Sequence, residues 1–295
     1  MSVTKVFLTG ATGYVGRPTV AALLRRGITV TALARSEHSA RTLSGLGAEP
    51  VRGTLTDTAV LREAASRADG VIHLGSDPGP GGDEVDRAAA EALLDGVGAG
   101  PYIHTGGAWV YGDTDGVADE AAPQKAPALT AWRRANEDLV LARATTGGHP
   151  VLVMPGVVYG HGAGLIDMFY TAPARERGAA PVIGDGRNHW GVVHVDDIAE
   201  LYALALGAPA GAVYVGVSEE SPTQADVAAA AAEAAGHPGR TESLTLEAGL
   251  ERMGPIAEAF ALDQRLTSAR ARRDTGWQPR HVDDVLTEIA RPTPA

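Results

Sequence analysis

The chain has 295 residues, of which 44% are hydrophobic and 21% are charged, and its formal net charge is -11 at pH 7. This length suits one large α/β domain or a domain with a smaller appendage, and the hydrophobic fraction excludes a disordered chain. The negative charge argues against a groove for nucleic acid, and the absence of cysteine excludes disulfides, thiolate metal sites and thiol nucleophiles.

No apolar run approaches the ~20 residues that cross a bilayer, and no apolar signal segment precedes the first strand-like run. We therefore expect a cytoplasmic protein that binds a small-molecule substrate and neither a membrane nor nucleic acid.

The first predicted strand, residues 5–9, is followed by a glycine-rich turn and then by a helix-like segment. Glycines in such a turn permit a tight bend, a close approach of a diphosphate to the main chain and close packing of the helix on the strand. The diphosphate then meets free amides at the positive end of the helix. We predict that the turn binds a dinucleotide through Gly10, Thr12, Gly13, Tyr14, Val15 and Gly16.

Strand-like and helix-like runs alternate through the first half of the chain. The predicted strands are residues 5–9, 28–34, 49–52, 70–74, 101–105 and 151–154. The predicted helices include residues 38–46, 59–68, 83–97 and 130–144, and the last of these presents Trp132, Ala135, Leu139 and Ala142 on one face. Repeated β-α units predict an α/β fold, namely a Rossmann-type doubly wound parallel sheet.

The alternation changes after residue 160. Residues 161–190 are rich in Gly and Pro with a helical piece at 165–177, whereas residues 192–194 and 197–206 indicate a return to the sheet and its flanking helix. One β-like stretch follows at residues 241–246. We predict a dinucleotide-binding domain over residues 1–160, with a return segment at 191–217, and mainly a small substrate-binding lid over residues 161–295.

The end of the second predicted strand selects the cofactor. An acidic side chain there would accept hydrogen bonds from a ribose 2′-hydroxyl, but the chain has Arg35 and Ser36 instead. A guanidinium grips a phosphate with two hydrogen bonds, so this pair favours NADP(H) over NAD(H). The alternative is a solvated arginine at the end of a strand.

Several motifs together resemble one family. Thr9-Gly10-Ala11-Thr12-Gly13-Tyr14-Val15-Gly16, Val110-Tyr111-Gly112, Pro155-Gly156-Val157-Val158-Tyr159-Gly160 and Val193-His194-Val195-Asp196-Asp197 are similar to those of the extended or atypical short-chain dehydrogenase/reductases, also called the NAD-dependent epimerase/dehydratase family. The resemblance implies that Leu74, Gly75 and Ser76 run along the diphosphate and ribose, that Pro155 and Val157 lie beside the nicotinamide, and that Leu55 lies near the adenine. It also implies a homodimer formed through helices 83–97 and 130–144.

The catalytic residues depart from the family pattern. Its members use a tyrosine, a lysine four residues later and a Ser or Thr, but the corresponding positions here are Leu129, Arg133 and Gly107. The nearest candidates are Thr105 to orient a carbonyl, Tyr111 to donate a proton and Arg133 to hold the ribose, and each has a purely structural alternative. His73, His104, His161 and His194 are scattered in the sequence, so we predict structural histidines and no metal-ligand cluster.

The residues expected to contact the substrate argue against a nucleotide sugar as the ligand. Relatives that bind nucleotide sugars often carry an arginine shortly after Gly-Asp-Gly, where this chain has Trp190. Together with Trp109, Tyr159, Met168, Phe169 and Tyr170, this residue favours a small, uncharged or partly apolar carbonyl compound, although such aromatics are also ordinary core residues. The sequence predicts a NADP(H)-dependent reductase or dehydrogenase. The alternatives are a NADP(H)-binding sensor or partner-binding module, and a cyclase, isomerase or dehydratase.

Overall fold

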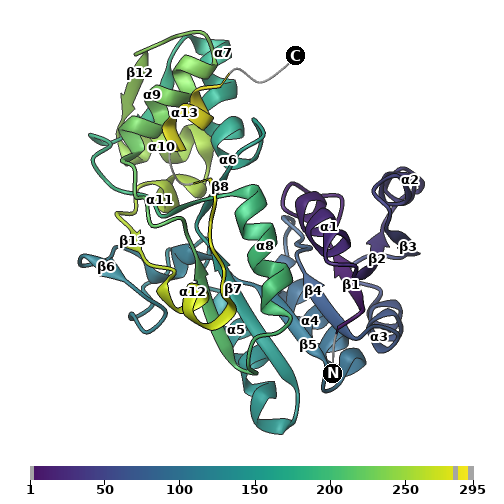
Figure 1. Ribbon diagram of the computed structural model, residues 1–295. Coiled ribbons are helices and arrows are strands. Elements are labelled where there is room, and N and C mark those ends of the chain that lie inside the picture. Colours follow the sequence, from purple (N-terminus) through teal and green to yellow (C-terminus); the bar gives the residue numbers. More distant parts are fainter. Residues whose placement is uncertain (1–2, 282–284, 292–295) are drawn as a thin grey trace.

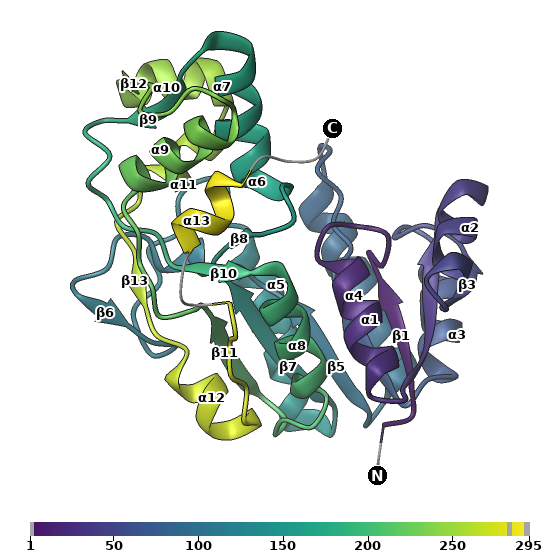
Figure 2. The same ribbon diagram turned by 45° about the horizontal axis from the view of Figure 1, so that its top comes forward.

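Seven parallel strands form the central sheet of the protein in a computed structural model, which describes residues 3–281 and 285–291 (Figures 1 and 2). Their order across the sheet is β11-β7-β5-β4-β1-β2-β3. The strands are β1 (Lys5–Thr9), β2 (Thr29–Ala34), β3 (Glu49–Arg52), β4 (Gly70–His73), β5 (Pro101–Thr105), β7 (His149–Pro155) and β11 (Ala212–Gly216). The order runs outwards from β1 to β3 on one side and from β4 to β11 on the other, so the predicted doubly wound sheet is confirmed.

Helices cover both faces of this sheet, which explains why its strands are apolar without alternation. In β1, Val6 and Leu8 pack with residues of α1 (Gly16–Arg25), α2 (Glu37–Gly45) and α8 (Val195–Ala205). Phe7 points the opposite way and packs with residues of α3 (Thr58–Ser66) and α4 (Gly82–Val97). The helix α5 (Arg133–Ala142) lies beside α4 on this second face.

Only part of the apolar face predicted for α5 is buried, namely Leu139, which packs against the core, and the half-buried Trp132. The residues that the helix buries are Asn136, Glu137 and Val140, whereas Ala135 and Ala142 are exposed. The polar residues face inward because the amide of Asn136 donates to the buried carboxylate of Asp86, at 2.9 Å. A polar contact therefore overrides the apolar periodicity.

The C-terminal part forms a lobe with its own core, beside the carboxyl ends of the strands (Figures 1 and 2). Its elements are α6 (Gly164–Ile166), the π-helical turn η3 (Asp167–Thr171), α7 (Ala172–Arg177), β9 (Ala180–Ile183), α9 (Gln224–Ala234), β12 (Thr241–Leu244), α10 (Leu246–Met253), α11 (Ile256–Phe260) and α13 (Val285–Ala290). Strand β12 pairs in parallel with β9, at the place where the sequence predicted a β-like stretch.

The expected return to the sheet is corrected in one detail. Strand β10 (Val192–His194) pairs with β8 (Val157–Tyr159) in a separate two-stranded sheet, and it is β11 that joins the central sheet. The remaining elements are η1 (Ala108–Tyr111), β6 (Val117–Ala118), η2 (Arg143–Thr146), β13 (Arg265–Leu266) and α12 (Ala269–Thr275).

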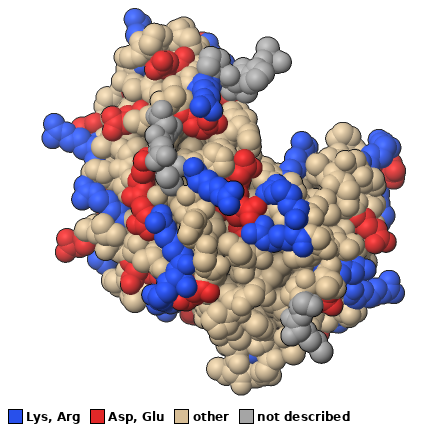
Figure 3. All heavy atoms as spheres, viewed as in Figure 1, with Lys and Arg blue, Asp and Glu red and all other residues tan. Residues whose placement is uncertain are grey.

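Figure 3 shows basic and acidic side chains intermixed on one face, and the surface is hollowed between the C-terminal lobe and the part that carries α1 and α2. No helix among the described residues is long and apolar enough to cross a membrane.

Candidate functional site

The glycine-rich turn joins β1 to α1 at the carboxyl edge of the sheet. Gly10 has a φ of +72°, and a Cβ there would lie 2.7 Å from the backbone nitrogen of Gly75. A Cβ on Gly16 would lie 2.1 Å from the carbonyl oxygen of Gly10, so the helix packs on the turn only because residue 16 has no side chain. Val15 precedes α1 without a side-chain cap, which leaves amides at this helix end for an anion.

A first cavity of about 560 Å³ opens over this turn. Its lining comes from the ends of β1, β2 and β4 and from the loop after β3, and includes Gly10, Thr12, Gly13, Leu55, Leu74 and Gly75. Arg35 also lines this cavity; its side chain is exposed and forms no ion pair with any residue that the structure describes. Ser36 is engaged otherwise, because its hydroxyl oxygen accepts the N–H of Ser39 at 3.1 Å and caps α2.

A second cavity of about 810 Å³ continues from the first, since both are lined by Ser76, Asp77 and Pro78. Tyr14, Val15, Pro155 and Val157 also line it, so the two cavities together bring most of the predicted cofactor residues to one continuous space. Its far end is largely apolar and is lined by Trp109, Leu129, Trp132, Leu165 and Met168.

Two of the three predicted catalytic side chains face elsewhere. The hydroxyl of Thr105 donates to the carbonyl oxygen of His73 at 2.7 Å and accepts from the hydroxyl of Tyr202 at 3.0 Å. Tyr111 is 2% exposed and its hydroxyl donates to the sulfur of Met154, while burial raises the pKa of this phenol. Neither residue is among those that line the two cavities, so the structure does not bring their hydroxyls together with the predicted cofactor residues.

Arg133 does line the second cavity, at the start of α5. One of its Nη atoms donates to the carbonyl oxygen of Thr105 at 3.2 Å, and its guanidinium lies 4.7 Å from the ring centroid of Trp132. Leu129 and Gly107 line the same cavity. Arg133 therefore presents a cation to this cavity, and Leu129, four residues earlier, has no group that could transfer a proton.

Glu137, one helical turn after Arg133, was not predicted as a site residue. Its side chain is 2% exposed, and neither carboxylate oxygen has a hydrogen-bond partner within the described part of the chain. A Cβ on Gly106 would come within 2.7 Å of this carboxylate. Desolvation, opposed by the charge of Arg133, raises the pKa of Glu137 to about 7. The i, i+4 spacing to Arg133 is the sequence signal that indicates this residue.

Only some of the aromatic and apolar side chains that were predicted to contact the substrate line the second cavity. Trp109 and Met168 line the second cavity, but Tyr159, Tyr170 and Trp190 are buried in the core of the C-terminal lobe and Phe169 packs against that core. The indole N–H of Trp190 donates to the carbonyl oxygen of Phe260, so this side chain is a packing residue and not a ligand wall.

The four scattered histidines form two clusters, which corrects the expectation that they lie apart. His73 and His104 approach the buried carboxylate of Asp86, at 3.5 and 3.8 Å. His161 and His194 lie beside Asp196, and the imidazole and carboxylate donor atoms of these three residues all lie within 4.8 Å of one another.

The model of the NAD dependent epimerase/dehydratase family matches residues 6–216 of the chain. An uncharacterized protein of Schizosaccharomyces pombe is 29% identical over 97% of this chain and 98% of its own length. A 2-alkyl-3-oxoalkanoate reductase of Stenotrophomonas maltophilia is 27% identical over 69% of this chain and 66% of its own length.

Among solved structures, a UDP-glucose 4-epimerase of Thermus thermophilus in complex with NAD superposes with a TM-score of 0.78, at 22% identity. The alignment covers 98% of this chain and 97% of that protein, so the two share the fold.

Proposed function

Because the chain belongs to the NAD dependent epimerase/dehydratase family, we propose that it is an NADP(H)-dependent oxidoreductase that reduces a small, partly apolar carbonyl compound. One observation carries this proposal: a continuous cavity runs from Arg35, a cation without an ion-pair partner among the described residues, across the glycine-rich turn, to a second cation at Arg133 in an apolar pocket. Two relatives carry the name of the reaction class that we assign: the oxoalkanoate reductase, and a ketoreductase of Stigmatella aurantiaca that is 44% identical over 23% of this chain.

The residues present fit a dinucleotide. The adenosine would occupy the first cavity, the diphosphate would lie over the amides around Gly13, and the nicotinamide, which supplies or accepts the hydride, would lie near Pro155 and Val157. The guanidinium of Arg35, which forms no ion pair within the described part of the chain, can donate two parallel hydrogen bonds to a 2′-phosphate. This pairing is the basis of the preference for NADP(H) over NAD(H).

Arg133 is the one cation among the described residues that line the second cavity. Its guanidinium has five N–H groups, of which one is bonded to the carbonyl of Thr105, so others remain to bind a carbonyl oxygen. A fixed cation stabilises the negative charge that this oxygen gains as hydride reaches the carbon. The oxygen then takes its proton from water, since the hydroxyls of Thr105 and Tyr111 are held away from the cavity.

Consumption of NADPH over a panel of ketones, enones and 3-oxo acids tests this function. We expect turnover with at least one partly apolar ketone and a loss of it in Arg133→Met. Binding of NADPH without turnover of any compound would overturn the reductase assignment while leaving the cofactor assignment intact.

Binding of NADPH without turnover also has support in the structure. The phenol and hydroxyl of the family pattern are replaced by Leu129 and Gly107, so the cavity could bind NADP(H) in a sensor or partner-binding module. A third reading is a cyclase, isomerase or dehydratase, and a product of unchanged oxidation state would identify it.

A further inference from the structure

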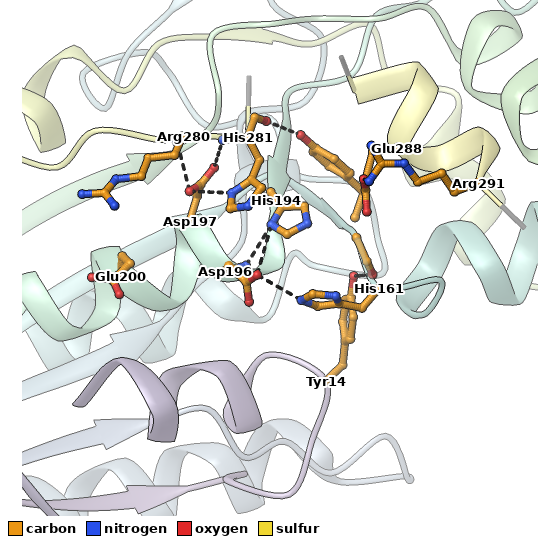
Figure 4. Close-up of polar contacts among 12 residues, drawn as sticks. Tyr14, His161, His194, Asp196, Asp197, Glu200, Arg280, His281, Glu288 and Arg291 are labelled. Atoms are coloured by element: carbon orange, nitrogen blue, oxygen red, sulfur yellow. Dashed lines mark hydrogen bonds and ion pairs between the residues drawn. The ribbon is translucent and has the colours of Figure 1, made fainter. Parts of the chain in front are cut away.

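Imidazoles and carboxylates from three distant segments meet at the start of α8 (Figure 4). His194 ends β10, Asp196 and Asp197 lie in the first turn of α8, His161 lies in the loop after β8, and His281 lies in the segment after α12. The ring of His194 lies between the other two, with centroids 5.3 Å from that of His161 and 3.9 Å from that of His281. Parallel pairing of β8 with β10 brings these segments together.

Three of these side chains, those of His161, His194 and Asp196, bring their ligand atoms within 4.8 Å of one another. Nε2 of His161 lies 3.0 Å from Oδ2 of Asp196, and Nδ1 of His194 lies 3.8 Å from the same oxygen. Ligand atoms bound at ~2.1 Å to one tetrahedral Zn²⁺ are roughly 3.4 Å apart, so this spacing already matches a shared ion. Two imidazoles and one carboxylate are a ligand set that Zn²⁺ accepts, with water in the fourth position.

The other two residues of the cluster are engaged elsewhere. The carboxylate of Asp197 accepts hydrogen bonds from the backbone N–H groups of Arg280 and His281 and from Nδ1 of His281, with nitrogen–oxygen distances of 2.9 to 3.0 Å. His281 is therefore held by Asp197 and stacks on the ring of His194. This pair supports the ligand set from behind and is not part of it.

The backbone orients the proposed ligands. The backbone N–H of Asp196 donates to Nδ1 of His194 at 3.2 Å, so this nitrogen carries a lone pair and the hydrogen is on Nε2. An ion bound at Nδ1 takes this lone pair and replaces the hydrogen bond that caps α8. A Cβ on Gly160 would lie 2.3 Å from that Nε2, so only glycine allows the ring to sit here. His161 has a φ of +55°, an uncommon conformation for a residue with a side chain, and in this conformation its ring reaches Asp196.

The site is open on one side. The His194 side chain is 3% exposed, whereas those of His161 and Asp196 are 57% and 38% exposed. An ion can enter from solvent and keep a water ligand. We propose that His161, His194 and Asp196 form a binding site for a divalent transition-metal ion such as Zn²⁺.

The proposed ion would hold the loop that borders the second cavity. The hydroxyl of Tyr14, in the glycine-rich turn, donates to the carbonyl oxygen of Gly160 at 2.7 Å. Gly164, at the other end of the same loop, packs against the ring of Tyr14 and lines the cavity. An ion on His161 therefore fixes this loop against the turn, and its role is to position the loop and not to act on substrate.

Titration of the metal-free full chain with Zn²⁺ tests the proposal, by calorimetry in competition with a chelator of known affinity. We expect one ion per chain, and affinity at least ~10-fold weaker in His161→Ala and Asp196→Asn. His237→Ala is the matched control, because this histidine lies beyond α9 in the C-terminal lobe. The affinity of this variant for Zn²⁺ should equal that of the wild type.

Cobalt gives a second readout, since Co²⁺ at a tetrahedral nitrogen and oxygen site absorbs visible light and the His161→Ala spectrum should lack this band. Circular dichroism checks that each variant folds. No stoichiometric binding, or equal binding by the wild type and His161→Ala, would overturn the site. Neither result depends on the cofactor or on turnover.

Discussion

Replacing Glu137 by glutamine should stabilise the protein above neutral pH. The carboxyl is buried beneath Gly106 with both oxygens lacking partners in the described chain, and its pKa is raised from 4.5 to about 7, chiefly by desolvation. This difference corresponds to about 3 kcal/mol at ~1.4 kcal/mol per pKa unit.

The sign follows from proton uptake. Below pH 4.5 the carboxyl is protonated in both the folded and the unfolded chain, so its ionisation does not change the free energy of unfolding. Between pH 4.5 and about 7 the unfolded chain has released this proton to water while the folded protein still holds it, so stability falls as the pH rises and the full loss is reached above about pH 7. Glutamine has no charge to bury, so Glu137→Gln should match the wild type near pH 4 and exceed it by about 3 kcal/mol at pH 8.

Urea unfolding at a series of pH values measures the difference between the two proteins, in which other titrating groups cancel. Asp138→Asn is the matched control, because this neighbour is exposed and pairs only at the surface with Arg134, so its effect should be below ~1 kcal/mol at every pH. A constant difference between Glu137→Gln and the wild type from pH 4 to 8 would refute the reasoning.

Three further changes test other parts of the account. Gly16→Ala places a Cβ 2.1 Å from the carbonyl oxygen of Gly10, so it should abolish cofactor binding in calorimetry while far-ultraviolet circular dichroism stays unchanged; normal binding would contradict the packing argument. Asp86→Ala removes the buried acceptor of the Asn136 amide and the carboxylate that lies 3.5 Å from the ring of His73, and should lower the free energy of unfolding by about 3 kcal/mol. Arg133→Met should lower kcat/KM by roughly 100-fold with little change in NADPH affinity, and an equal loss in both would indicate a role in cofactor binding alone.

The sequence predicted the parts of the site that depend on local pattern. A strand, a glycine-rich turn and a helix are adjacent in the chain, so Gly10, Gly13 and Gly16 could be assigned without knowing the rest of the fold. The positions of Leu129 and Arg133 followed from spacing along one helix, and both residues line the cavity. Parallel pairing, which needs only alternating runs, was also predictable.

Distant partners decided the rest. The hydroxyl of Thr105 bonds to Tyr202, 97 residues away, and nothing near residue 105 indicates that. Trp190 and Tyr170 are aromatic residues that suit a ligand-binding wall and a hydrophobic core equally well. The packing of both rings against Phe260 assigns them to the core. His161 and His194 are 33 positions apart, and only the β8–β10 pairing brings them together.

Calorimetric titration with NADPH and NADH measures whether the glycine-rich turn and Arg35 bind a phosphorylated dinucleotide. We predict that NADPH binds at least ~10-fold more tightly than NADH, and that Arg35→Glu reverses this preference, because a charge-assisted pair with the 2′-phosphate is lost and a repulsion replaces it. Absence of binding of either dinucleotide at millimolar concentration would contradict the account, and an unchanged preference in Arg35→Glu would contradict the role of Arg35.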